Sequence, residues 1–321
     1  SDDGLNVVYI DVEEADLLKA KADGVGDFNR VHGLVLGVKS EVKSTYGQSK
    51  AYCSFSYGFS SRIWNYRLAV EKSWFSKYRS TVGIDVHRLT DTNDKELVSD
   101  PECLIAEAIL GEAWRDFYQR EGVELSFAQK LMNSTKFELK YRYDEYTSLQ
   151  KTNNWSLLNR SYADGGWYEE FRWTGSRSIH SRGVLRYEDE KYKPENPPIE
   201  EGGMRSVIAE YTIDTRNSKT EPTSGWLNTF SAEYAGGRFG GDYNFSLYQV
   251  NIRRYNRLAG NQFLAFRIKA GTTDRGLSNL HPCKFYLGGI GTLRGYRFKE
   301  FAGDRMLLIN AEYWVTIGLP I

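Results

Sequence analysis

Apolar and polar residues alternate with a period of two along most of this chain, which predicts β-strands with one dry and one wet face. In 136–144 the positions between the charged residues are all apolar or aromatic, namely Phe137, Leu139, Tyr141 and Tyr143. Ten further segments show the same alternation: 29–40, 50–59, 64–71, 79–88, 121–131, 204–214, 226–235, 243–255, 262–270 and 306–316. The pattern therefore predicts an all-β chain of eleven strands, with a twelfth possible at Leu5–Val12.

A soluble β-sandwich shows the same alternation, so the alternation alone does not distinguish it from a membrane barrel. The residue types on the two faces provide the distinction. The wet faces carry full charges in mid-strand, which a water-filled lumen accommodates. The dry faces are rich in Tyr and Trp, which favour the two membrane interfaces. Short connections at 132–134 and 236–242 contrast with long ones at 89–120 and 147–203, as in outer-membrane barrels. These features favour a transmembrane antiparallel β-barrel over a soluble β-protein.

Composition narrows the possible functions. The 42 basic and 42 acidic residues cancel, which argues against a nucleic-acid partner. The sequence contains no G-x-S-x-G, H-E-x-x-H or phosphate-loop motif. The four histidines do not cluster at metal spacing; they are His32, His87, His180 and His281. Asp85 and His87 share a wet face that Glu124 could oppose, which is more typical of lumen electrostatics than of acid–base catalysis. We therefore expect no enzymatic activity, no cofactor and no metal.

A glycine-rich run with one arginine stands between two predicted strands. It reads Gly288, Gly289, Ile290, Gly291, Thr292, Leu293, Arg294, Gly295, Tyr296. Glycines allow a tight loop and a close approach to other backbone, and a guanidinium favours a planar acceptor. Two interpretations stay open on the residues alone. Either this is a surface hairpin loop with a solvated arginine, or the loop tucks into a cavity and is held there through Arg294.

This run, followed by a strand that reads Asn310-Ala311-Glu312-Tyr313, resembles the signature of the BamA/TamA-type outer-membrane protein assembly superfamily. Two further segments resemble parts of that family more weakly, the turn 214–225 and the segment 28–34. The resemblance covers about residues 28–316. It implies a bacterial outer-membrane location and a tetrad loop (Leu293-Arg294-Gly295-Tyr296 with its glycines Gly288, Gly289 and Gly291) that folds down into the lumen. There Arg294 would pair with Glu312, which lies on the wet face of its strand.

The resemblance also implies a mechanism and partners. Family barrels have sixteen strands. Either C-terminal strands are missing from this chain, or it forms a smaller barrel of eleven or twelve strands. A weakly paired seam would help to insert or translocate unfolded outer-membrane clients, and the expected seam strand is 29–40 with Gly33, Leu34, Leu36 and Gly37. Expected partners are outer-membrane lipid and lipopolysaccharide, client proteins, and accessory periplasmic or lipoprotein subunits. A barrel that anchors or exports a passenger, of the patatin-like type, and a passive porin remain alternatives.

Three further predictions concern short segments of the chain. Residues 1–27 are expected to form an N-terminal segment with a short amphipathic helix at Glu13–Lys21, ahead of a barrel domain at 28–321. Residues 101–118 have helical spacing, with Leu104 and Ala108 on the apolar face, and would either plug the barrel mouth or lie on its outer rim. The basic stretch 253–257 would contact anionic lipid head groups or simply end a strand in water.

Overall fold

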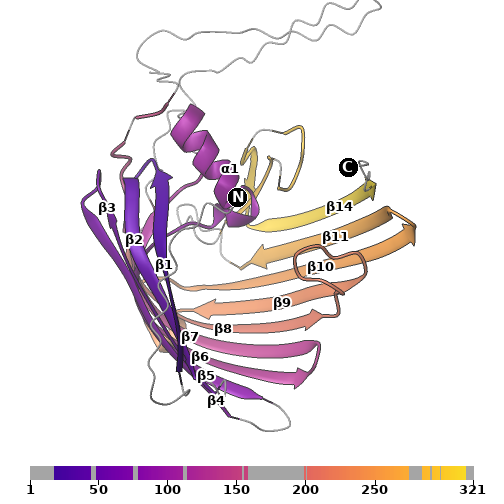
Figure 1. Cartoon of the computed structure of the whole chain (residues 1–321), viewed down its shortest axis with the longest axis horizontal. Coiled ribbons are helices and arrows are strands. Elements are labelled where there is room, and N and C mark those ends of the chain that lie inside the picture. Colours follow the sequence, from indigo (N-terminus) through magenta and orange to yellow (C-terminus); the bar gives the residue numbers. More distant parts are fainter. Residues whose placement is uncertain are drawn as a thin grey trace, which may run out of the picture.

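The computed structural model describes residues 18–44, 48–74, 79–110, 114–153, 155–157, 199, 201–274, 284–289, 291–296 and 298–315. Its dominant feature is one twelve-stranded antiparallel sheet, in which neighbours in the sequence are neighbours in space (Figure 1). The strands are β1 (Leu18–Asn29), β2 (Gly33–Ser44), β3 (Ser49–Gly58), β4 (Ile63–Trp74), β5 (Ser80–Asp91), β6 (Tyr118–Met132), β7 (Thr135–Ser148), β8 (Gly202–Asp214), β9 (Gly225–Ala235), β10 (Phe245–Ala259), β11 (Gln262–Thr273) and β14 (Arg305–Val315). The prediction of an all-β, antiparallel fold is confirmed.

Smaller elements occupy the connections. The β5–β6 connection holds η1 (Asp94–Glu96), α1 (Asp100–Ile105) and the π-helical turn η2 (Ala106–Leu110). The β9–β10 connection holds η3 (Gly237–Phe239), and the β11–β14 connection holds the paired strands β12 (Phe285–Leu287) and β13 (Phe301–Gly303). None of the helices among the described residues is long and apolar enough to cross a membrane.

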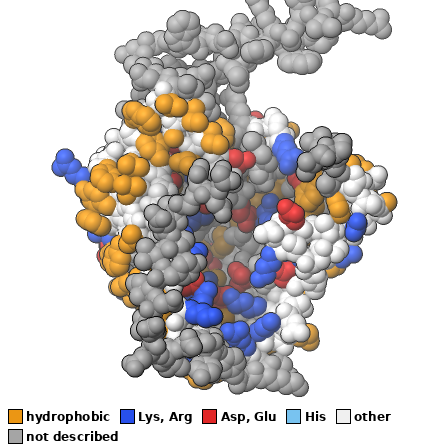
Figure 2. Space-filling model, in the orientation of Figure 1, with side chains coloured by type: hydrophobic (Ala, Val, Ile, Leu, Met, Phe, Trp, Pro, Cys, Tyr) orange, Lys and Arg blue, Asp and Glu red, His pale blue; other side chains and the backbone are white. Residues whose placement is uncertain are grey.

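The two faces of the sheet are inverted relative to a water-soluble fold. Leu307 and Ile309 of β14 are each 65% exposed, whereas Asp144 of β7 is 1% exposed. Figure 2 shows charged side chains of both signs gathered in the central hollow and hydrophobic side chains spread over the outer surface. Apolar side chains gain nothing from facing water, but they suit a hydrocarbon surround. This inversion is the arrangement of a transmembrane β-barrel wall, whose charged face we call the inner face.

The connections divide into two rims. The connections between β6 and β7 and between β10 and β11 are only two residues long, at 133–134 and 260–261. At the opposite ends of the strands lie the long connections 92–117, 149–201 and 274–304. The two predicted long loops therefore lie on the same rim as the connection that carries the tetrad loop.

The start of the sheet differs from the prediction. Leu18–Lys21, predicted as the end of a helix, belong to β1, so the sheet begins before the expected boundary at residue 28. β1 also alternates with a period of two, but most of the residues on its dry face are alanine or glycine. On that face, Phe28 and Gly26 lie opposite Leu34 and Leu36 of β2. Such small residues give a weak hydrophobic signal. The possible strand Leu5–Val12 and the first part of the predicted helix lie outside the described residues.

The predicted seam strand is also wrong. Gly33, Leu34, Leu36 and Gly37 lie in β2, which pairs with β1 on one side and with β3 on the other. Their backbone groups are thus engaged within the sheet, and β2 is not an edge. The two edges are β1 and β14, which share no pairing within the described part of the chain. The error follows directly from the missed first strand.

Candidate functional site

The tetrad loop, residues 288–296, lies at the tip of the β11–β14 connection. β12 and β13 form a short two-stranded stalk in which Phe285 lies opposite Gly303. Beyond the stalk, the backbone N–H of Gly289 donates to the carbonyl of Tyr296 at 3.2 Å, and that of Tyr296 donates to the carbonyl of Leu293 at 3.3 Å. These bonds close the loop on itself around the Leu293-Arg294-Gly295-Tyr296 tetrad.

Glycine is needed at the closest point between this loop and the β5–β6 connection. A Cβ at Gly291 would lie 2.4 Å from the carbonyl oxygen of Glu96 and 2.6 Å from that of Leu97, both backbone atoms. The N–H of Gly291 instead donates to the carbonyl of Leu97 at 3.2 Å. The loop therefore contacts a second connection that is about two hundred residues away in the sequence, and only glycine permits the contact.

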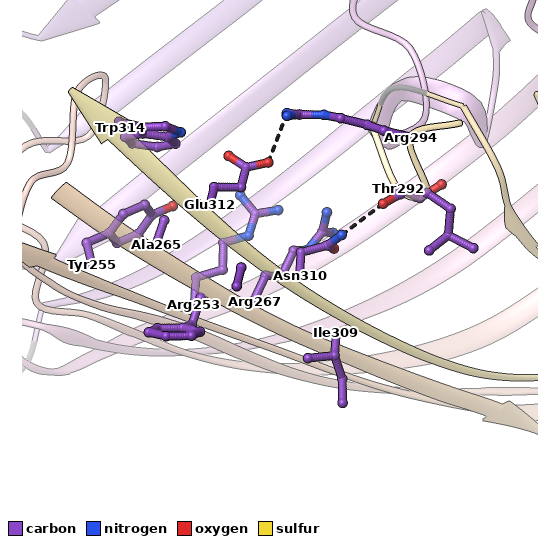
Figure 3. A pocket seen from close by; sticks show the side chains of 14 residues that line it. Arg253, Tyr255, Ala265, Arg267, Thr292, Arg294, Ile309, Asn310, Glu312 and Trp314 are labelled. Atoms are coloured by element: carbon purple, nitrogen blue, oxygen red, sulfur yellow. Dashed lines mark hydrogen bonds and ion pairs between the residues drawn. The ribbon is translucent and has the colours of Figure 1, made fainter. Parts of the chain in front are cut away.

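The structure brings Arg294 and Glu312 together. The Arg294 guanidinium donates to a Glu312 carboxylate oxygen at 2.9 Å, and the Asn310 side chain donates to the carbonyl of Thr292 at 2.9 Å (Figure 3). Glu312 follows Arg305, the first residue of β14, by seven residues. The loop therefore meets the strand roughly 23 Å from the start of β14. The Arg294 side chain is nevertheless 69% exposed, against 34% for Glu312.

Lys299 makes a second and more buried ion pair, which was not predicted from the sequence. Its ammonium group donates to Asp94 at 2.7 Å and also to Asp116, and it lies 4.8 Å from the ring centre of Tyr286. The Lys299 side chain is 12% exposed and that of Asp94 is 1% exposed. Burial raises the pKa of Asp94 above its ordinary value, although the charge of Lys299 opposes this. The lysine joins the base of the tetrad loop to the β5–β6 connection.

Glu96 joins the same connection to the inner face of the sheet. Its carboxylate accepts from Lys269 at 2.5 Å and from Arg267 at 3.0 Å, both of β11. Burial by itself would raise the pKa of Glu96, but Lys269 and Arg267 hold it below the ordinary value. Residues 94–96 therefore connect the sheet to the base of the tetrad loop, because Glu96 pairs with β11 and Asp94 pairs with Lys299.

The helical part of the β5–β6 connection is shorter than predicted and buries another face. It ends at Leu110, and Leu104 and Ile105 are exposed, whereas Cys103, Ala106 and Glu107 are buried. Glu107 accepts from the backbone N–H of Arg30 at 2.8 Å and from the thiol of Cys103 at 3.1 Å. The helix thus contacts the β1–β2 turn.

The residues just before the helix contact the tetrad loop's connection. Leu97 and Val98, together with Cys103 of the helix itself, form a hydrophobic cluster against which Tyr286 and Phe298 pack. Since the helical segment reaches from the β1–β2 turn to the β11–β14 connection, the placement over the mouth is favoured over the outer rim.

The structure also locates two further sets of residues singled out in the sequence, the charged group around His87 and the basic stretch 253–257. Glu124 lies directly opposite Asp85, as predicted, but the partners of His87 are Asp85 at 2.9 Å and Asp144 at 3.2 Å. Arg120 and Arg142 also contact Asp144, which makes this a network of wall charges. The basic stretch 253–257 splits between the faces: Arg254 lies over the Trp226 ring on the outer face, while Arg253 faces inward (Figure 3).

Sequence comparisons show which known proteins this chain is similar to. The sequence profile of the Omp85 superfamily domain matches residues 49–318. The outer membrane protein assembly factor BamA of Nitratidesulfovibrio vulgaris is 34% identical over 140 residues, which are 38% of this chain and 18% of that protein.

Two solved structures are also similar. BamA from Haemophilus ducreyi lacking POTRA domains 1-3 superposes with a TM-score of 0.49 at 13% identity, over 92% of this chain and 51% of that one. CdiB from Acinetobacter baumannii gives 0.44 at 10% identity, over 95% and 48%. This chain spans about half the length of those two proteins. The profile match alone covers well over half of this chain, and it confirms the resemblance seen in the tetrad: the chain belongs to the Omp85 superfamily of bacterial outer-membrane β-barrel proteins.

Proposed function

We propose that this chain helps to insert or translocate proteins at the outer membrane through a poorly paired seam, and that the seam is bounded by β1 and β14, the two edges of the sheet within the described residues. The observation that carries the proposal is the twelve-stranded sheet, whose two edges have no partner strand in the part of the chain that the structure describes. Unpaired backbone N–H and C=O groups are costly in lipid. A client strand added to either edge satisfies them by β-augmentation, so client folding itself supplies the driving force.

The tetrad loop has a mechanical part in this proposal. Arg294 and Glu312 hold the loop tip against β14, next to one side of the seam, and Lys299 holds its base. A loop fixed in this way supports the edge strand from inside while the outer side stays available to lipid and client. Outer-membrane lipid, lipopolysaccharide, client proteins and accessory periplasmic or lipoprotein subunits are the partners that this role requires.

Site-specific photo-crosslinking tests the seam. A crosslinking amino acid replaces Ile309, which points outward on the edge strand β14, or Phe230, which points outward on the interior strand β9. We expect newly made outer-membrane proteins to be captured from position 309 and not from position 230. Equal capture at both positions would contradict a seam at β14.

Depletion tests the role in cells. Loss of the protein should lower the abundance of other outer-membrane barrels, measured by quantitative proteomics of the membrane fraction. An unchanged outer-membrane proteome, together with a steady high single-channel conductance of the purified protein, would favour the passive porin instead.

A further inference from the structure

A cleft of about 470 Å³ separates the tetrad loop from the wall formed by β10, β11 and β14. Arg294 and Thr292 line it from the loop, and Arg253, Arg267, Asn310 and Glu312 line it from the strands (Figure 3). The Ile309 side chain extends to the opposite side of the sheet from these polar groups. Cavities of this size accommodate small organic ligands as well as single ions.

The charges around the cleft do not balance. Arg253 lies directly opposite Arg267 in the β10–β11 register, and like charges in such positions repel. Arg267 is compensated by Glu96 at 3.0 Å, and Arg294 by Glu312 at 2.9 Å. Glu96 is shared with Lys269. Among the described residues no carboxylate pairs with Arg253, and its buried Nε has no hydrogen-bond partner there.

We propose that this cleft binds an oxyanion, a phosphate or carboxylate group, with Arg253 as its principal ligand and Arg267 and Arg294 beside it. A buried donor without a partner carries a desolvation cost that a bound acceptor removes. The planar fork of a guanidinium matches two oxygens of a phosphate or carboxylate. An anion at this point also offsets the repulsion between Arg253 and Arg267. The amide of Asn310 is already engaged with Thr292, so the arginines supply the binding.

The position of the cleft leaves two sources for the anion. Its strand residues, from β10, β11 and β14, lie toward the short-turn rim, beside β14, which is an edge of the sheet among the described residues. A free anion could enter from that rim, and the head group of an anionic lipid could enter past the edge. Both present the same chemistry to the arginines.

Thermal unfolding of the purified protein in a neutral detergent tests the proposal, with inorganic phosphate replacing chloride at constant ionic strength. Binding to the folded state raises the unfolding midpoint in a saturable manner. We expect this rise in the wild type, and an apparent affinity at least tenfold weaker in Arg253→Gln. The matched control is Arg254→Gln, whose side chain lies over Trp226 on the outer face and which should respond like the wild type.

No rise in the wild type, or an equal response from Arg253→Gln and the wild type, would overturn the proposal. A second series adds phosphatidylglycerol or phosphatidylcholine to the micelles and supports the site in either of two forms. A smaller phosphate response with phosphatidylglycerol alone indicates a lipid head group as the occupant, and an unchanged response indicates a free anion. Neither series depends on client insertion, so the proposed function is tested separately.

Discussion

Arg294 and Lys299 belong to the same connection and both form ion pairs, but in opposite surroundings. Arg294 is visible in the sequence motif, yet its side chain is largely exposed where it meets Glu312. Lys299 lies outside the motif, yet it is buried against Asp94 and Asp116. Water screens an exposed pair to about 0–1 kcal/mol, whereas removing one partner of a buried pair leaves a costly uncompensated charge. A motif that marks a loop therefore need not contain the residue that contributes most to holding it.

Lys299→Met tests this comparison with the largest expected effect. The change leaves Asp94 and Asp116 without their cation, and we expect it to destabilise the loop by about 3 kcal/mol. Limited proteolysis of residues 284–303 and the unfolding midpoint in detergent measure the loss. The exposed Lys95→Met on the same connection is the control and should have little effect. Recovery of stability in Lys299→Met/Asp94→Asn would show that the unpaired carboxylate is the cause.

Glu107 extends the comparison from the loop to the helix that contacts it. Burial, first of all, raises the pKa of Glu107 to about 7, and the charge of Asp27 adds to this. The folded state therefore keeps a proton that the unfolded state releases near pH 4.5. The protonated Glu107 carboxyl contributes to the free energy of unfolding in full below pH 4.5. This contribution, up to roughly 3 kcal/mol, is lost as the pH rises through about 7.

Glu107→Gln removes that dependence, because glutamine stays neutral and still offers an oxygen to the Arg30 N–H. We expect the variant to be more stable than the wild type at pH 8 and similar to it at pH 4, measured by unfolding midpoints across this range. Glu221→Gln, in an exposed turn, should follow the wild-type profile. Parallel profiles for Glu107→Gln and the wild type would contradict the assignment.

Gly291→Ala addresses the close contact between the tetrad loop and the β5–β6 connection. Its methyl group would meet the carbonyl oxygens of Glu96 and Leu97, so we expect a loss of about 1–3 kcal/mol, typical of overpacking. The control is Gly26→Ala in β1, where a Cβ meets nothing within 4 Å. A variant with wild-type protease resistance at the loop would mean that the two connections can separate without cost.

Arg294→Ala should have the smallest effect on stability, at most about 1 kcal/mol, measured by the same unfolding midpoint. The expected consequence is instead local: the loop tip leaves β14, and single-channel recordings should show more frequent openings than in the wild type. A larger loss of stability from Arg294→Ala than from Lys299→Met would reverse the comparison.

Local and distant features differed in how well the sequence revealed them. Strand positions such as 136–144 were predictable because alternation is a property of adjacent residues. Glu312 could be assigned to the inner face for the same reason. β1 was missed because Gly24 and Gly26 carry its alternation. The contact of Lys299 with Asp94 joins positions 205 residues apart, and no spacing in the sequence encodes it. The buried face of the helix was missed because it includes Glu107, a residue that amphipathic patterns assign to water.

Among the described residues the sheet has an even number of strands, and this limits what can occupy the gap between its edges. β1 runs toward the long-loop rim and β14 runs away from it. A lone guest strand placed between them would lie antiparallel to one neighbour and parallel to the other, and parallel pairing is slightly weaker. A guest hairpin meets both neighbours in the antiparallel sense. Incoming strands that arrive already paired with each other thus fit this opening better than single strands do.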